Sequence, residues 1–351
     1  MKIRSVISHA LIMTMAIALV VGLVGVVDGE AKTVTIKVVD HSPPKGLRAV
    51  SINYVIKEVE KQTGGEVKFQ TYWAGSLLKI REMVRGISEG VADMAWMWPP
   101  KHPTEYPAWQ ALSAIVVGPK DLRKAVQIGA DLVENIPAFK ADFEKWNTKP
   151  MGYNQVTGGC LFMTKPIDTI WDLKGMKVRS PDPAHLTMLA ALGATPVYIP
   201  MSDTYSALQR GTVDGVFTFI ESGHRFKFHE VTKYIYPCTY LWAQGPNVVA
   251  LNMDTWNKIS KKNQQIFLDV CKAMGKETAD ITMEHEALER DDFKKAGCQV
   301  RDIPKADLIK WAQMPKVVAM QDKWIEKANK AGLPGDLIMK RVKGIVSKAL
   351  K

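Results

Sequence analysis

The sequence predicts an α/β protein made of two similar lobes. Its 351 residues are too many for one ordinary hydrophobic core. Segments with strand and helix patterns alternate along the chain, and this order favours largely parallel sheets covered by helices on both faces. The alternation runs once from residue 33 to residue 98 and again from residue 151 to residue 219. We therefore expect two α/β units in one chain.

The first unit consists of short segments with clear periodicity. Apolar residues at positions 52, 55, 56 and 59 share one face of a helix, which ends at the glycines at positions 64 and 65. The neighbouring segments are rich in the β-branched and aromatic residues typical of strands. The expected elements are strands at residues 33–39, 67–73 and 92–98 and helices at residues 49–61 and 80–88.

The second unit carries one arginine, Arg179, at the end of its first strand. A guanidinium group offers planar, bidentate donors that match a carboxylate. Strand ends in an α/β sheet open into the crevice where ligands bind. We therefore expect Arg179 to bind a ligand carboxylate. The alternative is a surface ion pair with Asp172 or Asp182.

Residues 262–295 form the longest segment with helical character. They contain no proline and a single glycine, Gly275, and their apolar face is only loosely defined. One long helix that touches two bodies in turn would have this pattern. Two shorter helices that break near Gly275 would fit it equally well.

Two G-x-x-D segments place Asp93 and Asp214 at the start of apolar strands. A pair of carboxylates can serve acid/base chemistry. However, an aspartate in a turn also accepts hydrogen bonds from nearby backbone amides, and its place before a strand favours this structural role.

The strands that follow these turns end in aromatic residues. The first gives Trp96, Met97 and Trp98, and the second gives Phe217, Thr218 and Phe219. Because successive side chains point to opposite faces, some of each triplet lies in the core. We expect Trp98, Phe217 and Thr218 to contact a ligand, since aromatic rings supply large contact areas at little entropic cost.

Composition and motifs exclude several classes of protein. The formal charge of +11 is spread along the chain, without a dense basic tract interleaved with aromatic residues, so we expect no nucleic-acid partner. A field that attracts anionic solutes, or a solvated basic face, explains the charge better. The sequence lacks a nucleophile elbow, a zinc-protease motif and a Walker loop. We expect neither an enzyme nor a cofactor.

The cysteines and histidines give no metal-binding pattern. The four cysteines are far apart and would form either one or two disulfides or buried free thiols; they are Cys160, Cys238, Cys271 and Cys298. His224 and His229 have no further ligands nearby in the sequence, so surface histidines are expected.

Residues 1–31 have the features of a signal peptide. Lys2 and Arg4 form a basic start, residues 10–27 are apolar, and small residues precede a cleavage site after Ala31. An uncleaved membrane anchor is the alternative. Cleavage would release the chain into the periplasm.

Several blocks resemble the solute-binding proteins of tripartite ATP-independent periplasmic (TRAP) transporters, the DctP family. They are residues 173–179 (LKGMKVR), 192–196 (LGATP), 205–215 (YSALQRGTVDG) and 252–256 (NMDTW). The resemblance implies a two-lobed periplasmic binding protein fold. Each lobe would have a mixed, mostly parallel sheet flanked by helices, and a long helix would span both. Residues 32–155 and 247–284 would form lobe I, and residues 156–246 and 285–351 lobe II.

The resemblance also implies site residues. In this family the arginine of the K-x-R strand anchors the substrate carboxylate, and Arg179 matches it. Thr218 occupies the place of an asparagine that often touches ligand. Where many members have a second arginine, this chain has neutral Asn154 and Gln155.

Two further residues complete the expected site. Trp73, within residues 72–76, would face Arg179 from lobe I together with Trp98. Some family members hold a cation beside the carboxylate. Glu221 is the only nearby candidate ligand for one, and we expect no metal.

The resemblance implies an extracytoplasmic receptor that delivers an organic acid to TRAP permease subunits. The loss of one cation and the gain of aromatic residues favour a less polar monocarboxylate over sialic acid or C4-dicarboxylates. A periplasmic enzyme on the same frame and a ligand-binding sensor remain the alternatives.

Overall fold

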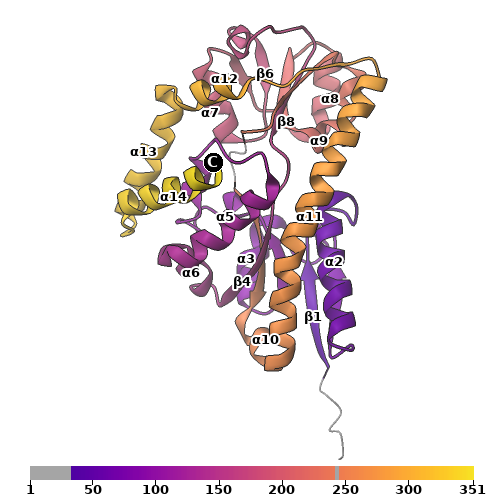
Figure 1. Ribbon diagram of the computed structural model, residues 1–351, viewed down its shortest axis with the longest axis vertical. Helices are drawn as coiled ribbons and strands as arrows, with labels where there is room; N and C mark the ends of the chain where they lie inside the picture. The colour runs from indigo at the N-terminus through magenta and orange to yellow at the C-terminus, as the bar shows by residue number, and fades with distance from the viewer. Residues whose placement is uncertain (1–32, 242–244) are drawn as a thin grey trace, which may run out of the picture.

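The computed structural model describes residues 33–241 and 245–351. The predicted signal peptide, residues 1–31, lies outside the described residues. No helix in the described part combines the length and apolar character needed to cross a membrane. The described chain forms two lobes stacked along the long axis of the molecule (Figure 1).

Lobe I is built on a five-stranded sheet with the order β2-β1-β3-β10-β4. Strands β1, β2 and β3 are parallel, and β10 runs antiparallel to both β3 and β4. The strands are β1 (Val34–Val39), β2 (Val67–Tyr72), β3 (Met94–Met97), β4 (Thr148–Asn154) and β10 (Asn247–Asn252). Both faces are covered, since Trp96 and Met97 enter different hydrophobic clusters.

Lobe II is built on a six-stranded sheet with the order β11-β9-β5-β8-β6-β7. Strands β6, β7 and β8 are parallel, whereas β5 is antiparallel to β8 and β9. The strands are β5 (Gly159–Met163), β6 (Lys177–Arg179), β7 (Thr195–Val197), β8 (Gly215–Phe219), β9 (Tyr234–Cys238) and β11 (Gln299–Val300). The prediction of two mixed sheets flanked by helices is confirmed.

The helices before the long helix cover the two sheets. Those of the first segment are α2 (Gly46–Gln62), α3 (Met83–Ser88), α4 (Gln110–Ser113), α5 (Leu122–Asn135) and α6 (Pro137–Glu144). Those of lobe II and the returning chain are α7 (Pro183–Ala191), α8 (Met201–Gln209), α9 (Ile220–Arg225) and α10 (Met253–Lys258).

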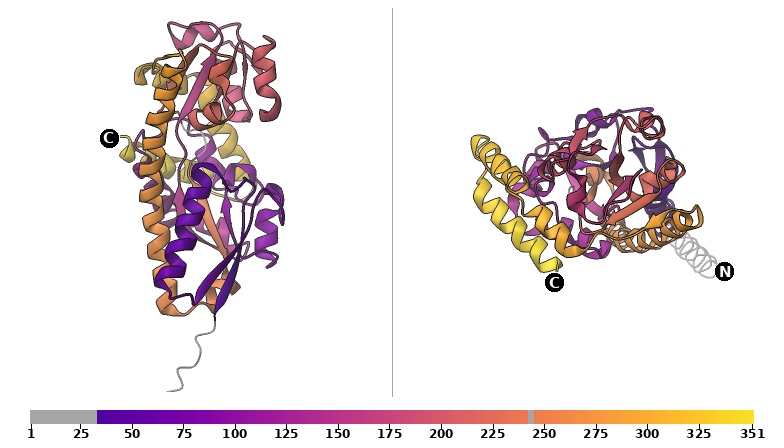
Figure 2. Two further views of the ribbon diagram at one scale, coloured as in Figure 1. Left: turned by 90° about the vertical axis from the view of Figure 1, so that its right-hand side faces the viewer. Right: turned by 90° about the horizontal axis from the view of Figure 1, so that it is seen from above.

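A single helix, α11 (Lys261–Lys295), runs along both lobes (Figure 2). Its first half packs in lobe I through Phe267 and Met274, and its last turn places Phe293 in the core of lobe II. It does not break at Gly275. A β-carbon there would lie 2.8 Å from the carbonyl oxygen of Tyr153, so this glycine permits close packing on β4.

The C-terminal helices return to lobe I. They are α12 (Lys305–Ala312), α13 (Pro315–Lys330) and α14 (Gly335–Ala349). Trp311 of α12 packs in lobe II, but Trp324 of α13 and Val342 of α14 belong to a lobe I cluster. The expected boundary assigned residues 285–351 to lobe II. The structure instead shows α13 and α14 crossing back over lobe I (Figure 1).

The structure resolves two alternatives left by the sequence. All four cysteines are free and buried. Asp93 and Asp214 serve the backbone of the adjacent strand, since they accept hydrogen bonds from the amides of Lys37 (2.8 Å) and Lys177 (2.9 Å). These carboxylates have the structural role that their position in the turn favours.

Candidate ligand-binding site

The helices that follow β1 in lobe I and β8 in lobe II approach one another. Glu221, in the first turn of α9 after β8 of lobe II, approaches Gly46 at the start of α2 in lobe I. A β-carbon on Gly46 would lie 3.6 Å from Glu221 Oε1. Because β6 is parallel to β8, Arg179 ends at the same edge of the lobe II sheet. Arg179 and Glu221 therefore follow the same edge of the lobe II sheet, and Glu221 approaches lobe I.

Arg179 is fully buried and only partly satisfied. Its Nε donates to the carbonyl oxygen of Ile199 at 2.7 Å, and its Nη1 lies 3.8 Å from the sulfur of Met201. Its Nη2 has no hydrogen-bond partner. In the described part of the chain Arg179 forms no ion pair with Asp172, Asp182 or any other carboxylate.

Burial lowers the pKa of Arg179 to about 10, because the low-dielectric interior disfavours the charged form. The group therefore keeps its positive charge near neutral pH. Isolation of a buried cation from any counter-ion costs several kcal/mol, on the order of the penalty for other desolvated ions. An anion that reached Nη2 would offset part of this cost.

The crossing between β4 and β5 supplies buried neutral polar groups. Asn154 donates through Nδ2 to Ser51 Oγ at 3.0 Å, but its Oδ1 accepts nothing. Gln155 donates through Nε2 to the carbonyl oxygen of Val156 at 3.1 Å, and its Oε1 is also without a partner. The hydroxyl of Thr157 is likewise unpaired. Buried polar atoms of this kind are normally satisfied, so their clustering at one crossing fits a polar ligand.

Trp98 and Trp73 remain half-buried at the strand ends of lobe I. Trp98 directly follows β3, and the Lys101 ammonium group lies 4.7 Å from the centre of its ring. Trp73 directly follows β2 and packs on a lobe I cluster. Both tryptophans retain exposed surface for a further contact.

The structure places Phe217 in the core of lobe II rather than at an open surface. Its ring is fully buried between His185 (centroid distance 4.5 Å) and Trp311 (5.6 Å). Gly159 on β5 leaves room for this ring, since a β-carbon there would lie 2.6 Å from it. The neighbouring Thr218 points to the opposite face and is also buried.

Glu221 is engaged within lobe II as well as near lobe I. Its carboxylate lies 3.3 Å from Arg225 of the same helix. His224 lies 3.3 Å from Asp292 and stacks on His229. Within residues 33–241 and 245–351 no group of three or more histidine, cysteine or acidic residues has the arrangement of a metal site.

Two polar residues near the strand ends were not anticipated. His41 follows Asp40 at the end of β1, and its Nδ1 is buried without a partner. Burial lowers the pKa of His41 to about 4, so the ring is neutral at physiological pH. His185 is buried in α7, with Nδ1 3.3 Å from Ser180 Oγ and Nε2 unpaired. The sequence shows that His41 follows a predicted strand, but no local pattern in it singles out His185.

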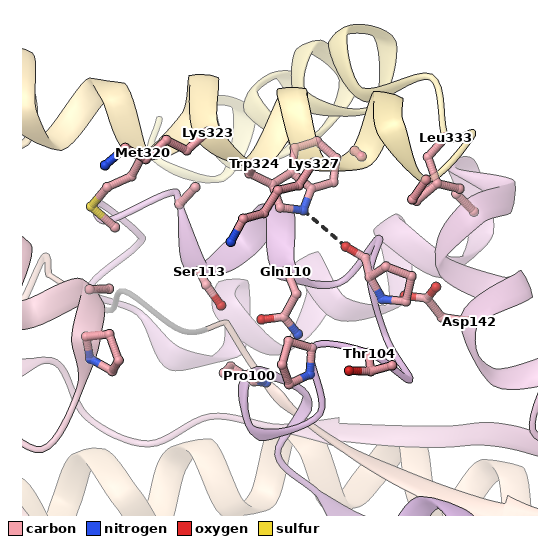
Figure 3. A pocket seen from close by; sticks show the side chains of 18 of the residues that line it. Pro100, Thr104, Gln110, Ser113, Asp142, Met320, Lys323, Trp324, Lys327 and Leu333 are labelled. Carbon is pink, nitrogen blue, oxygen red and sulfur yellow. Dashed lines mark hydrogen bonds between the residues drawn. The ribbon is translucent and has the colours of Figure 1, made fainter.

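A cavity enclosed by described residues lies beside this region. It has a volume of about 780 Å³ and is bounded by α4, α6, α7 and α13 (Figure 3). None of the predicted site residues lines it. The cavity is therefore separate from the Arg179 region.

Known proteins share both the sequence pattern and this fold. The family model for bacterial extracellular solute-binding proteins, family 7 (DctP), matches residues 40–324. A solute-binding protein of Verminephrobacter eiseniae is 26% identical over 285 residues, which cover 80% of this chain and 83% of that protein.

Two solved structures have the same architecture. A TRAP periplasmic solute-binding protein from Desulfovibrio salexigens superimposes with a TM-score of 0.80 at 25% identity, over 90% of this chain and 96% of the other. A TRAP solute-binding protein from a marine metagenome, crystallised with 3-hydroxybenzoate, gives a TM-score of 0.74 at 24% identity, over 91% and 99%.

The family match spans both lobes and most of the described chain, and the resemblance inferred from residues 173–215 is thereby confirmed. The chain belongs to the DctP family of TRAP transporter solute-binding proteins.

Proposed function

We propose that the protein is an extracytoplasmic receptor that binds a small organic acid between its lobes, with the acid's carboxylate on Arg179. The observation that carries this proposal is the state of Arg179 itself. It is a fully buried cation at a strand end with a free Nη2 donor and no carboxylate partner in the described chain. A ligand carboxylate would supply both the missing acceptor and the missing charge.

The other predicted residues favour a monocarboxylate with an apolar or aromatic body. Asn154 and Gln155 offer neutral oxygens instead of a second cation, and these accept hydrogen bonds from a hydroxyl or amide of the ligand. Trp98 and Trp73 provide ring surface in lobe I. The metagenomic relative was crystallised with 3-hydroxybenzoate. That ligand combines a single carboxylate with an aromatic body. Phe217 is left out of this proposal because its ring is enclosed by lobe II.

The test is a thermal-shift screen of residues 32–351 against aromatic, aliphatic, keto, hydroxy and dicarboxylic acids. A ligand that binds only the native state raises the melting temperature. We expect a rise for monocarboxylates that disappears in Arg179→Ala. Arg210→Ala is the matched control, because Arg210 is an exposed arginine of the same lobe. Equal shifts in both variants would remove Arg179 from the site.

Delivery to TRAP permease subunits in the periplasm follows from the same proposal. The permease must distinguish loaded from empty receptor, and a ligand held by both lobes biases the closed arrangement by its differential affinity. Small-angle X-ray scattering would detect this closure as a smaller radius of gyration with the acid. An unchanged radius at saturating acid would exclude closure as the signal.

A further inference from the structure

The cavity under α13 is built from several separate segments of the chain. Its floor comes from the segment after β3 and from α4, with Pro100, Pro103, Gln110 and Ser113. Its side comes from the start of α7 in lobe II, and its roof from α13 with Trp324 and Lys327 (Figure 3). The volume of about 780 Å³ is within the range of roughly 300–1,000 Å³ typical of small-molecule pockets.

The walls are mostly apolar and rigid. Four prolines line the cavity, together with Met320, Leu333 and several alanines; the prolines are Pro100, Pro103, Pro107 and Pro183. The Trp324 ring is held in place because its Nε1 donates to the carbonyl oxygen of Pro107 at 3.1 Å. Such walls suit an extended apolar group.

The lysines around the cavity have no close partner among the described residues. The ammonium groups of Lys145, Lys323 and Lys327 form no hydrogen bond or ion pair within the described part of the chain. In Figure 3 the side chain of Lys327 extends from α13 towards the floor, where the Ser113 hydroxyl is buried without a partner. A carboxylate between them would engage both.

The two acidic residues in the lining oppose an anion only weakly. Asp142 accepts a hydrogen bond from the backbone amide of Trp109 at 3.0 Å, and burial raises its pKa to about 7, which reduces its charge near neutral pH. Asp182 caps α7 by accepting from the amides of Ala184 and His185. Three lysines therefore dominate the local charge.

We propose that this cavity is a second ligand site, distinct from the Arg179 region, for an organic anion with an extended apolar body, such as an aliphatic carboxylate. Lys327 and Ser113 hold the carboxylate, and the prolines and Trp324 contact the apolar body. Because the walls come from both lobes and from α13, the occupant couples to the lobe arrangement and modulates binding of the transported acid.

Titration calorimetry with octanoate tests the site. Wild-type protein and Arg179→Ala should bind octanoate with the same Kd. Lys327→Ala should weaken binding about fivefold, the effect of one partly exposed ion pair. Lys330→Ala is the matched control one turn along α13, where the ammonium group already pairs with Glu326. It should leave the Kd unchanged.

A second variant tests the cavity without a change of charge. Thr187 is a half-buried residue of the α7 wall, and Thr187→Trp should fill the space and abolish octanoate binding. The proposal is overturned if octanoate gives no heat at millimolar concentration, or if both Lys327→Ala and Thr187→Trp bind normally. Loss of octanoate binding in Arg179→Ala would place octanoate in the Arg179 site instead. That last result overturns the second site but leaves the proposed function standing.

Discussion

Both lobes join a G-x-x-D turn to a neighbouring strand in the same way. In lobe I, Asp93 and Lys37 of β1 exchange hydrogen bonds, and in lobe II, Asp214 and Lys177 of β6 do the same. The strands joined by these turns end differently. Asp40, after β1, is buried and paired with Arg48 at 2.6 Å, whereas Arg179, at the end of β6, has no counter-ion in the described chain.

This difference distinguishes a buried charge that is paired within the protein from a buried charge that is not. A buried ion pair that satisfies itself contributes to one stable arrangement and needs nothing from outside. A buried cation without a partner reduces stability unless a ligand completes it. The two lobes thus share these turns, and of the charged groups Asp40 and Arg179 only Arg179 lacks a counter-ion among the described residues.

The largest expected change in the free energy of unfolding comes from substituting an aromatic residue of β8 or of the segment after β3. Phe217→Ala should lower the free energy of unfolding by about 4 kcal/mol, because it leaves a cavity in the lobe II core. Trp98→Ala should cost less stability and weaken acid binding instead. Urea unfolding and calorimetric titration of both variants measure the contrast. If Phe217→Ala kept full stability and lost affinity, its placement in the core would be contradicted.

Breaking the ion pair between Asp40 and Arg48 in lobe I should give the next largest loss of stability. Arg48→Met should lower the free energy of unfolding by about 3 kcal/mol, since it leaves the Asp40 carboxylate buried and unpaired. Arg179→Met removes an unpaired charge and should leave the stability of the empty protein unchanged or higher. Thermal unfolding of the two variants compares the lobes directly. Equal destabilisation would show that the two charges have the same role.

Substitution of a tightly packed residue in the lobe I half of α11 should lower the stability of the protein. Gly275→Ala places a methyl group against the carbonyl oxygen of Tyr153 and should cost about 2 kcal/mol by overpacking. Gly344→Ala in α14 meets open space and should be neutral or stabilising by about 0.5–1 kcal/mol. The midpoints of urea unfolding of the two variants, compared with wild type, measure these changes in stability. A harmless Gly275→Ala would mean that α11 does not pack closely on β4.

Substitution of the two turn aspartates, Asp93 and Asp214, should give the smallest losses of stability, and the two losses should be similar. Asp93→Ala and Asp214→Ala should each cost about 1–2 kcal/mol, because each leaves a backbone amide without its acceptor. Unequal losses of more than about 2 kcal/mol would break the equivalence of the two turns.

The lowered pKa of Asp214 also predicts that the stability of the protein depends on pH. The hydrogen bond from the Lys177 amide lowers the pKa of Asp214 in the folded protein. The contribution of Asp214 is therefore complete above the unfolded pKa of about 4 and is lost as the pH falls through the lower folded value. Unfolding curves of wild type and Asp214→Asn should differ at pH 6 and converge at more acidic pH. A constant difference at all pH values would contradict this assignment.

Local patterns predicted most of the fold. The helix at residues 49–61 and the strand at residues 67–73 were expected from periodicity and appear as α2 and β2. The position of α13 and α14 could not be predicted, because an amphipathic face does not specify which core will cover it. Gly275 looked like a possible break because its low helix propensity is visible in the sequence, but its packing against Tyr153 is not.

The sequence shows directly where a charged residue ends a strand, whereas the contacts of that residue depend on the fold. Arg179 stood out because it ends a strand. Phe217 was misleading, because the alternation of a strand covered on both faces does not reveal which of its residues meets a cavity. His41 and His185 were missed because their unpaired nitrogens depend on tertiary packing.

The most direct test of the account combines a change in the protein with the matching change in the ligand. Calorimetry would compare benzoate with benzamide, or the corresponding pair for whichever acid the screen identifies, on wild-type protein and on Arg179→Ala. If Arg179 holds the carboxylate, each single change should weaken binding by about 100-fold or more, and the second change should add almost nothing. Fully additive losses would show that the carboxylate is bound elsewhere and would contradict the account.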